Sequence, residues 1–245
     1  MDLVNESHLS KFQVAIFFVG LLRISVVDIL TNFLPKHNKR FNAVPFIYTE
    51  ADRQREQFSP EAPFVIFKSA DNNWVFPIAT SRADIGRIKT SEHDVLDSHD
   101  LSQQCTSILN DFIESTGMAV WRLGLICERI IYQQTPAAFL SHLFCKETWT
   151  QPQRPLGNLN NFEVHFHEVL DLQGVTINSW TRFKTGILPS GEETKPVVVV
   201  EQDINTLSDD KSREYHREKL SDFLDGALKI MDHSFISFFP DEVTL

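Results

Sequence analysis

The 245-residue chain has 42% hydrophobic and 23% charged residues, an ordinary globular composition that predicts one or two domains with buried cores. Its 33 acidic and 23 basic residues leave a formal net charge of -10, which disfavours nucleic-acid binding because phosphate backbones are repelled. Three cysteines without a CxxC pair support neither a disulfide framework nor a zinc knuckle, and they predict reduced core residues of a cytoplasmic protein.

A strand and a helix are the first elements predicted along the chain. Residues 11–20 are rich in β-branched and aromatic side chains, and apolar residues recur at helical spacing over 24–34. The apolar run over 12–22 is shorter than the roughly twenty residues that a membrane span needs. The N-terminus carries Asp2 and Glu6 and no basic leader segment, so we expect neither a signal peptide nor a membrane span.

Strands and a second helix are predicted over the rest of the first half. In chain order they are strands over 44–50 and 62–82, a hairpin turn at 71–73, a helix over 100–117 and a buried strand over 118–132. Asp100 is the expected N-cap of that helix and Gly117 its C-cap. This order predicts an antiparallel sheet with helices on one face.

The second half begins with a short helix and a segment that resembles a linker. The predicted elements are a helix over 136–146, a linker over 147–161, a hairpin over 163–184 with its turn at Gln173 and Gly174, a strand over 196–204 and a final long helix. The final helix has apolar residues at helical spacing, namely Leu220, Phe223, Leu224, Ala227, Leu228, Met231 and Phe235. No repeat of fixed period is found in the sequence.

These elements predict an α+β fold with two successive, mainly antiparallel sheets and helices packed on one face of each. The linker divides the chain into an N-terminal subdomain, 1–150, and a C-terminal subdomain of hairpin, strand and long helix, 151–245.

The hairpin carries a candidate metal or catalytic face. On an extended strand, alternate side chains share a face, so Glu163, His165, His167 and Asp171 point the same way. The two-residue turn places Arg182 opposite His165, and an arginine opposite a ligand disfavours a divalent cation. A solvated face or a partner-binding surface is therefore the leading interpretation, and no cofactor is expected. The alternative is a metal-dependent hydrolase or nuclease, with Arg182 stabilising an anionic transition state.

Two charged surfaces remain as interaction candidates. The outer face of the final helix is acidic, and Asp222, Asp225 and Asp232 are candidates for contact with a basic partner. A basic cluster comprises Lys36, His37, Lys39, Arg40, Arg53 and Arg55. Because it lacks interleaved stacking aromatics, we interpret it as a solvated loop, and a nucleic-acid site is the last of the alternatives. Twenty phenylalanines further suggest exposed aromatic surface at an interface.

The order of several segments resembles a sporadically distributed, largely uncharacterised family of bacterial proteins of about this length. The resemblance lies in 64–82, in 121–130 and in 197–239, and it spans most of the chain. Arg122, Gly124 and Leu125 match an Arg-x-Gly-Leu-Arg-Tyr strand of that family, whereas Ile126 and Cys127 replace its Arg-Tyr pair. Because the family is often encoded near mobile elements and phage-defence genes, the resemblance implies a component of a multi-protein system.

The sequence therefore predicts a non-catalytic protein that binds a partner or senses a ligand, in antiviral defence or another multi-protein bacterial system. It has no phosphate-cradling glycine loop, nucleophile elbow or HExxH motif. We expect a protein partner or a homo-oligomer, and contact with neither nucleic acid nor a membrane.

Overall fold

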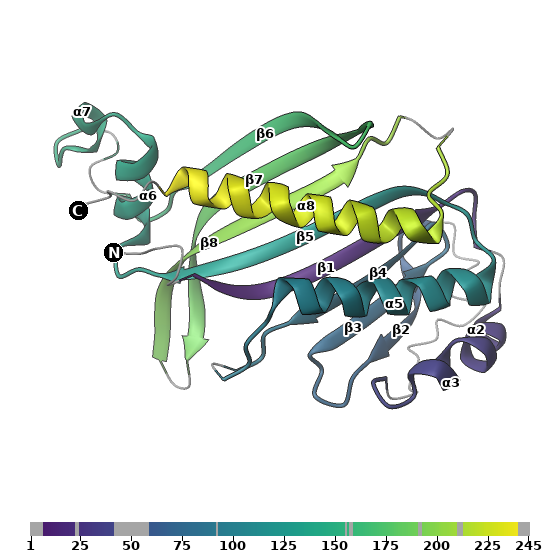
Figure 1. Ribbon diagram of the computed structural model, residues 1–245. Helices are drawn as coiled ribbons and strands as arrows, with labels where there is room; N and C mark the ends of the chain where they lie inside the picture. Colours follow the sequence, from purple (N-terminus) through teal and green to yellow (C-terminus); the bar gives the residue numbers. More distant parts are fainter. Residues whose placement is uncertain are drawn as a thin grey trace.

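The computed structural model describes residues 7–22, 25–41, 59–91, 93–154, 156, 159–190, 193–209 and 213–239 (Figure 1). Its strands are β1 (His8–Phe18), β2 (Pro63–Lys68), β3 (Trp74–Ala79), β4 (Arg82–Ile88), β5 (Val120–Tyr132), β6 (Glu163–Leu172), β7 (Val175–Ser190) and β8 (Glu193–Thr206). Its helices are α2 (Val26–Asn32), α3 (Leu34–His37), α5 (Ser98–Thr116), α6 (Pro136–Phe144), α7 (Glu147–Thr150) and α8 (Arg217–Phe238). The strand predicted over 44–50 lies outside the described residues.

The strands form one sheet of eight, in the order β2-β3-β4-β1-β5-β8-β7-β6, and every pairing is antiparallel. The α+β class is correct, but the prediction of two successive sheets is wrong. The apolar strand β8 pairs with β5 on one side and β7 on the other, so it joins the predicted sheets. Pairing both edges of β8 satisfies backbone groups that would otherwise remain as open edges. The sheet is therefore continuous across the predicted boundary between the two subdomains at residue 150.

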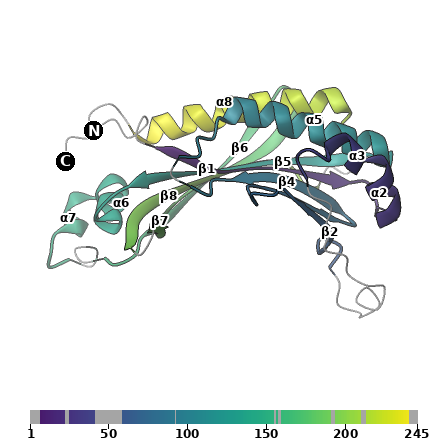
Figure 2. The same cartoon turned by 90° about the horizontal axis from the view of Figure 1, so that it is seen from below.

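The long helices α5 and α8 lie on the same side of the sheet (Figure 2). Helix α5 begins one turn earlier than predicted, because Asp97 and not Asp100 is the N-cap: its side chain accepts a hydrogen bond from the Asp100 N–H. Gly117 ends the helix in the left-handed conformation, with φ of 64°, as its C-cap position predicts.

The two halves of the fold have the same topology. In each half one strand is followed by a helical insertion, a three-stranded meander and a long helix; β1 and β5, the first strands, pair with each other at the centre. The buried stripes of α5 and α8 also match in spacing: Leu101, Cys105, Ile108, Leu109 and Phe112 correspond to Leu220, Leu224, Ala227, Leu228 and Met231. The fold is therefore an internal duplication that the sequence does not reveal as a repeat.

The sheet registers extend this match to the meanders. The separation in sequence between Ala83 of β4 and Leu101, the first stripe residue of α5, equals that between Gln202 of β8 and Leu220, the first stripe residue of α8. Ile78 pairs with Ala83, and Thr181 pairs with Gln202. Ile78 of β3 therefore corresponds to Thr181 of β7, and two residues earlier Phe76 corresponds to Ser179.

Buried phenylalanines form the centre of the first half. The Phe76 ring centroid lies 5.4 Å from those of Phe33 and Phe112, and all three side chains are fully buried. A second aromatic cluster joins α6 and α8 to the hairpin strands, for example through Phe144 and Phe183, 4.9 Å apart. No described phenylalanine is among the exposed large apolar side chains. The inference of an interface from excess phenylalanine is therefore wrong for the described residues, since most of these rings are buried in the core and the others are partly buried.

The final helix and the hairpin have the predicted geometry. The whole apolar stripe of α8 is buried, from Leu220 to Phe235. Gln173 and Gly174 form the turn, both with positive φ, and Arg182 lies opposite His165 in the register. Among the described residues, no helix is both long enough and apolar enough to cross a lipid bilayer.

Candidate anion-binding pocket

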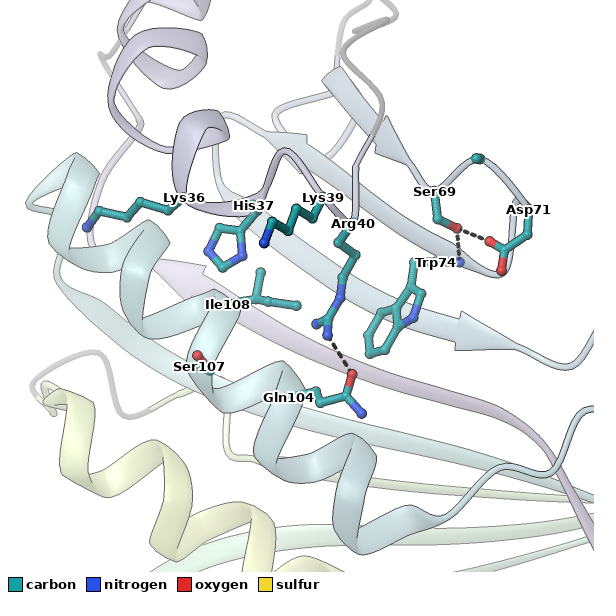
Figure 3. A pocket seen from close by; sticks show the side chains of 11 residues that line it. Lys36, His37, Lys39, Arg40, Ser69, Asp71, Trp74, Gln104, Ser107 and Ile108 are labelled. Atoms are coloured by element: carbon teal, nitrogen blue, oxygen red, sulfur yellow. Dashed lines mark hydrogen bonds between the residues drawn. The ribbon is translucent and has the colours of Figure 1, made fainter.

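A pocket of about 670 Å³ opens between the end of α3, the β2–β3 turn and α5 (Figure 3). Its volume lies in the range of small-molecule sites. Lys36, Lys39 and Arg40 line it from the segment around α3, Trp74 from β3, and Gln104 from α5. We call this cavity the basic pocket.

Arg40 is the central cation of the basic pocket. Its guanidinium carbon lies 4.8 Å from the centroid of the Trp74 ring, and its Nη2 donates a hydrogen bond to Gln104 Oε1 at 2.7 Å. Arg87 approaches the same ring but pairs with Asp94 at 2.7 Å. Within the described part of the chain Arg40 has no carboxylate at ion-pair distance, although the charge of Asp100, which is hydrogen-bonded to Gln104, acts on it from further away. Burial lowers the pKa of Arg40 from its ordinary value, although a guanidinium stays protonated.

The other cations differ in how far they are neutralised. Lys36 Nζ lies 3.5 Å from Glu114 Oε2 and 3.9 Å from Asp111 Oδ1. Lys39 is exposed and has no ion-pair partner among the described residues. Lys39 and Arg40 thus stand beside one cavity, and neither has a carboxylate at ion-pair distance among the described residues.

His37 lines the basic pocket behind these cations. Burial lowers its pKa, and this effect is partly offset by Asp111, whose Oδ2 lies 3.0 Å from His37 Nε2. Burial therefore favours the neutral form of His37, whereas Lys39 and Arg40 stay charged.

The β2–β3 turn forms the rim opposite the lysines. The Asp71 carboxylate accepts hydrogen bonds from the Ser69 hydroxyl and from the backbone N–H of Asn73, the latter at 3.1 Å. These hydrogen bonds, that from Ser69 first, hold the pKa of Asp71 below its ordinary value. Asn72 has a positive φ of 56°, as asparagine in a tight turn tolerates. Asp71 is therefore engaged in shaping the turn and is not an ion-pair partner of Arg40.

The basic pocket offers groups that bind anions. Guanidinium and ammonium groups donate charge-assisted hydrogen bonds to phosphate and carboxylate oxygens. The nearby Cys105 thiol is fully buried, and burial raises its pKa well above the ordinary value, so it does not supply a thiolate nucleophile.

The residues of the candidate metal face lie on one face of β6, as predicted, but do not converge on a common point. His165 Nε2 lies 2.7 Å from Glu163 Oε1. The His167 ring stacks on Trp180 with centroids 4.1 Å apart. Asp171 Oδ1 instead accepts a hydrogen bond from the Gly174 N–H at 2.9 Å.

Arg182 completes this face and is paired with Glu201 of β8. It is thus part of a surface ion-pair network, with Asp203 3.9 Å away. Within the described ranges no group of three or more histidine, cysteine, aspartate or glutamate side chains is placed to hold a metal ion. The β6 face therefore has the polar side chains of the predicted site without its geometry.

The three aspartates proposed for partner contact differ in their surroundings. Asp225 is exposed, and Asp222 lies 3.4 Å from Lys219 on the same helix. Asp232 Oδ1 accepts a hydrogen bond at 2.6 Å from Arg129, whose side chain is only 11% exposed. Arg129 also donates to Gln202, which is buried. Asp232 therefore helps to hold α8 on the sheet.

Replacing Asp232 by alanine should lower the free energy of unfolding by about 1 kcal/mol, because Arg129 loses a charged acceptor that is itself half-exposed. Asp225→Ala should change it by no more than about 0.5 kcal/mol. Urea unfolding of the two variants provides the measurement. Equal stability of both would show that the Arg129–Asp232 contact does not stabilise the helix.

The sequence predicts the basic cluster but not the cavity that this cluster lines. Lys36, His37, Lys39 and Arg40 are predicted to be solvated; Lys36 and Lys39 are exposed, and all four line one cavity. Arg53 and Arg55 lie outside the described residues. Trp74 and Gln104 come from distant elements, so no local spacing could indicate that they meet Arg40. The Trp74 ring does lie next to Arg40, but the fold brings it there, because Trp74 is far from the basic cluster in sequence.

Comparison of the sequence with known protein families and with curated proteins finds no match.

Proposed function

We propose that this protein is a non-catalytic binding component that recognises an anionic small molecule in the basic pocket. The observation that carries the proposal is Arg40, a partly buried guanidinium positioned by Trp74 and Gln104 without a carboxylate partner in the described structure. Burying an uncompensated charge is costly, and a bound anion would remove that cost.

The charge distribution supports the same proposal. The whole chain carries a net charge of -10, so a general attraction of anions to its surface is not expected. Lys39 and Arg40 form a local exception at a cavity large enough for a ligand such as a nucleotide. The ligand would be held by charge-assisted hydrogen bonds, with the planar guanidinium donating to two oxygens.

The wider setting follows from the sequence resemblance alone. We propose a cytoplasmic protein of a bacterial multi-protein system, phage defence being one such system, in which ligand binding would be passed to a protein partner or a second copy of the chain. The exposed Asp222 and Asp225 remain proposed contacts for such a partner.

Pyrophosphate is a suitable probe of the pocket, since its chemistry is that of the phosphate groups common to many cellular anions. We expect the wild-type protein to bind it in calorimetric titration, and Arg40→Gln to weaken binding by about 1.5–3 kcal/mol, or roughly tenfold to a hundredfold. Arg40→Lys should lie in between, because a lysine keeps the charge but not the bidentate geometry.

Lys184→Gln provides a matched control, since it removes one positive charge from the opposite face of the sheet, in the other half. It should leave pyrophosphate affinity unchanged. Thermal unfolding of every variant checks that the fold is retained. Equal affinity of wild type and a folded Arg40→Gln variant, or no binding at millimolar pyrophosphate, would refute the proposal.

A further inference from the structure

A second cavity lies in the other half of the fold, between α8 and the β6–β7 hairpin. Its volume is about 850 Å³. Figure 1 shows α8 crossing the sheet with β6 beyond it at the sheet edge. Phe166 and Leu170 of β6 and Ile230 and Phe238 of α8 supply apolar walls. We call this cavity the hairpin groove.

The floor of the hairpin groove is polar. It is lined by Ser179 and Thr181 of β7, whose side chains are only 5% and 4% exposed. Neither hydroxyl has a hydrogen-bond partner in the described structure, although other polar side chains nearby are paired: Gln202, for example, donates to the Met231 carbonyl at 2.7 Å. The two oxygens are not among the buried polar atoms that lack a hydrogen bond in the described residues, so they are open to the cavity, where each can donate a hydrogen bond to a ligand.

The internal duplication shows that this polar floor is not a general requirement of the fold. The positions that correspond to Ser179 and Thr181 in the first half are Phe76 and Ile78, both fully buried. There, Phe33 and Phe41 from the segment around α2 and α3 pack over Phe76, with centroids 5.4 and 6.2 Å away. The same place is thus filled with aromatic rings in one half, and is open and lined by hydroxyls in the other.

The hairpin groove is closed at the end nearest the β6–β7 turn. Leu172 packs against Gly226 of α8, and a Cβ at this glycine would require the leucine side chain to shift. Lys229 and His233 of α8 and Glu168 of β6 also line the cavity. The cavity therefore has apolar sides, a floor with two hydrogen-bond donors and charged lining side chains of both signs.

We infer that the hairpin groove binds an amphiphilic small molecule, with its apolar body between β6 and α8 and a hydrogen-bond-accepting carbonyl or carboxylate head on the Ser179 and Thr181 hydroxyls. Each hydroxyl can donate one hydrogen bond, so together they match the two lone pairs of one such oxygen or the two oxygens of a carboxylate. This site is separate from the basic pocket, and its test does not depend on that pocket.

Decanoate tests both parts of this assignment, and decyltrimethylammonium is its control, since it has the same chain without an acceptor. In calorimetric titration decanoate should bind, whereas acetate and decyltrimethylammonium should bind at least tenfold more weakly. The double change Ser179→Ala and Thr181→Val should weaken decanoate binding about tenfold or more. The same double change should leave the thermal midpoint of the free protein nearly unchanged, because neither hydroxyl makes a hydrogen bond to another described residue.

Arg40→Gln should bind decanoate like the wild type, which separates this site from the basic pocket. Three results would overturn the inference: no decanoate binding at millimolar concentration, equal binding of decyltrimethylammonium, or unchanged binding in the double variant. The second would reduce the groove to a non-specific apolar surface, and the third would remove the role of the hydroxyls.

Discussion

Replacing Phe76 by alanine should lower the free energy of unfolding by about 3–5 kcal/mol. The ring is fully buried and touches Phe33, Phe41, Phe67 and Phe112, so its removal leaves a cavity in the centre of the first half. A loss of this size is a large part of the roughly 5–15 kcal/mol that stabilises a typical domain. Chemical denaturation followed by tryptophan fluorescence, with Trp74 nearby, is the measurement.

Phe76→Leu is the matched control, since it keeps an apolar side chain of similar reach and should cost less than half as much. If Phe76→Ala were as stable as the wild type, the aromatic cluster would not be the core of this half. The contrast between a filled position at Phe76 and an open position at Ser179 would then also not hold.

Replacing Phe223 by alanine should have a similar effect in the second half, about 3–5 kcal/mol, since the side chain is only 5% exposed beneath α8. Asp222→Ser together with Asp225→Ser should stay within about 1 kcal/mol of the wild type, because both side chains are exposed. If Phe223→Ala left the free energy of unfolding unchanged and the aspartate variants unfolded, the buried and exposed faces of α8 would be reversed.

The two phenylalanine variants together also test the unity of the sheet. Since β1 pairs with β5 along most of its length, we expect the halves to unfold in one transition whose midpoint falls in either variant. Two transitions, each shifted by only one of the variants, would instead support separate folding units such as 1–150 and 151–245.

Local elements could be predicted because their signals are local. The turn at Gln173 and Gly174 fixed the register of ten residue pairs between β6 and β7. The stripe of α8 likewise predicted its buried face, from 3.6-residue periodicity. The joining of two sheets into one could not be predicted in this way, because the pairing of β5 with β8 links residues far apart in sequence and apolar strands have many equivalent partners.

The duplication and both cavities were hidden for a related reason. The two halves share one topology, although the side chains at corresponding positions differ, as with Phe76 and Ser179. The basic pocket arises where Arg40, Trp74 and Gln104 meet from three elements. Of the sequence-based sites, the β6 face was placed correctly on one strand face, but its side chains pair with separate neighbours, and periodicity cannot predict such pairing.

The most direct test of the anion-binding proposal is a crystal of the protein soaked in tungstate, an oxyanion whose metal atom is located by anomalous scattering. We expect an anomalous peak in the basic pocket, within hydrogen-bond distance of the Arg40 guanidinium and close to Lys39, and no such peak in the Arg40→Gln variant. Tungstate bound only elsewhere on the protein, with the basic pocket empty and open to solvent, would contradict the account.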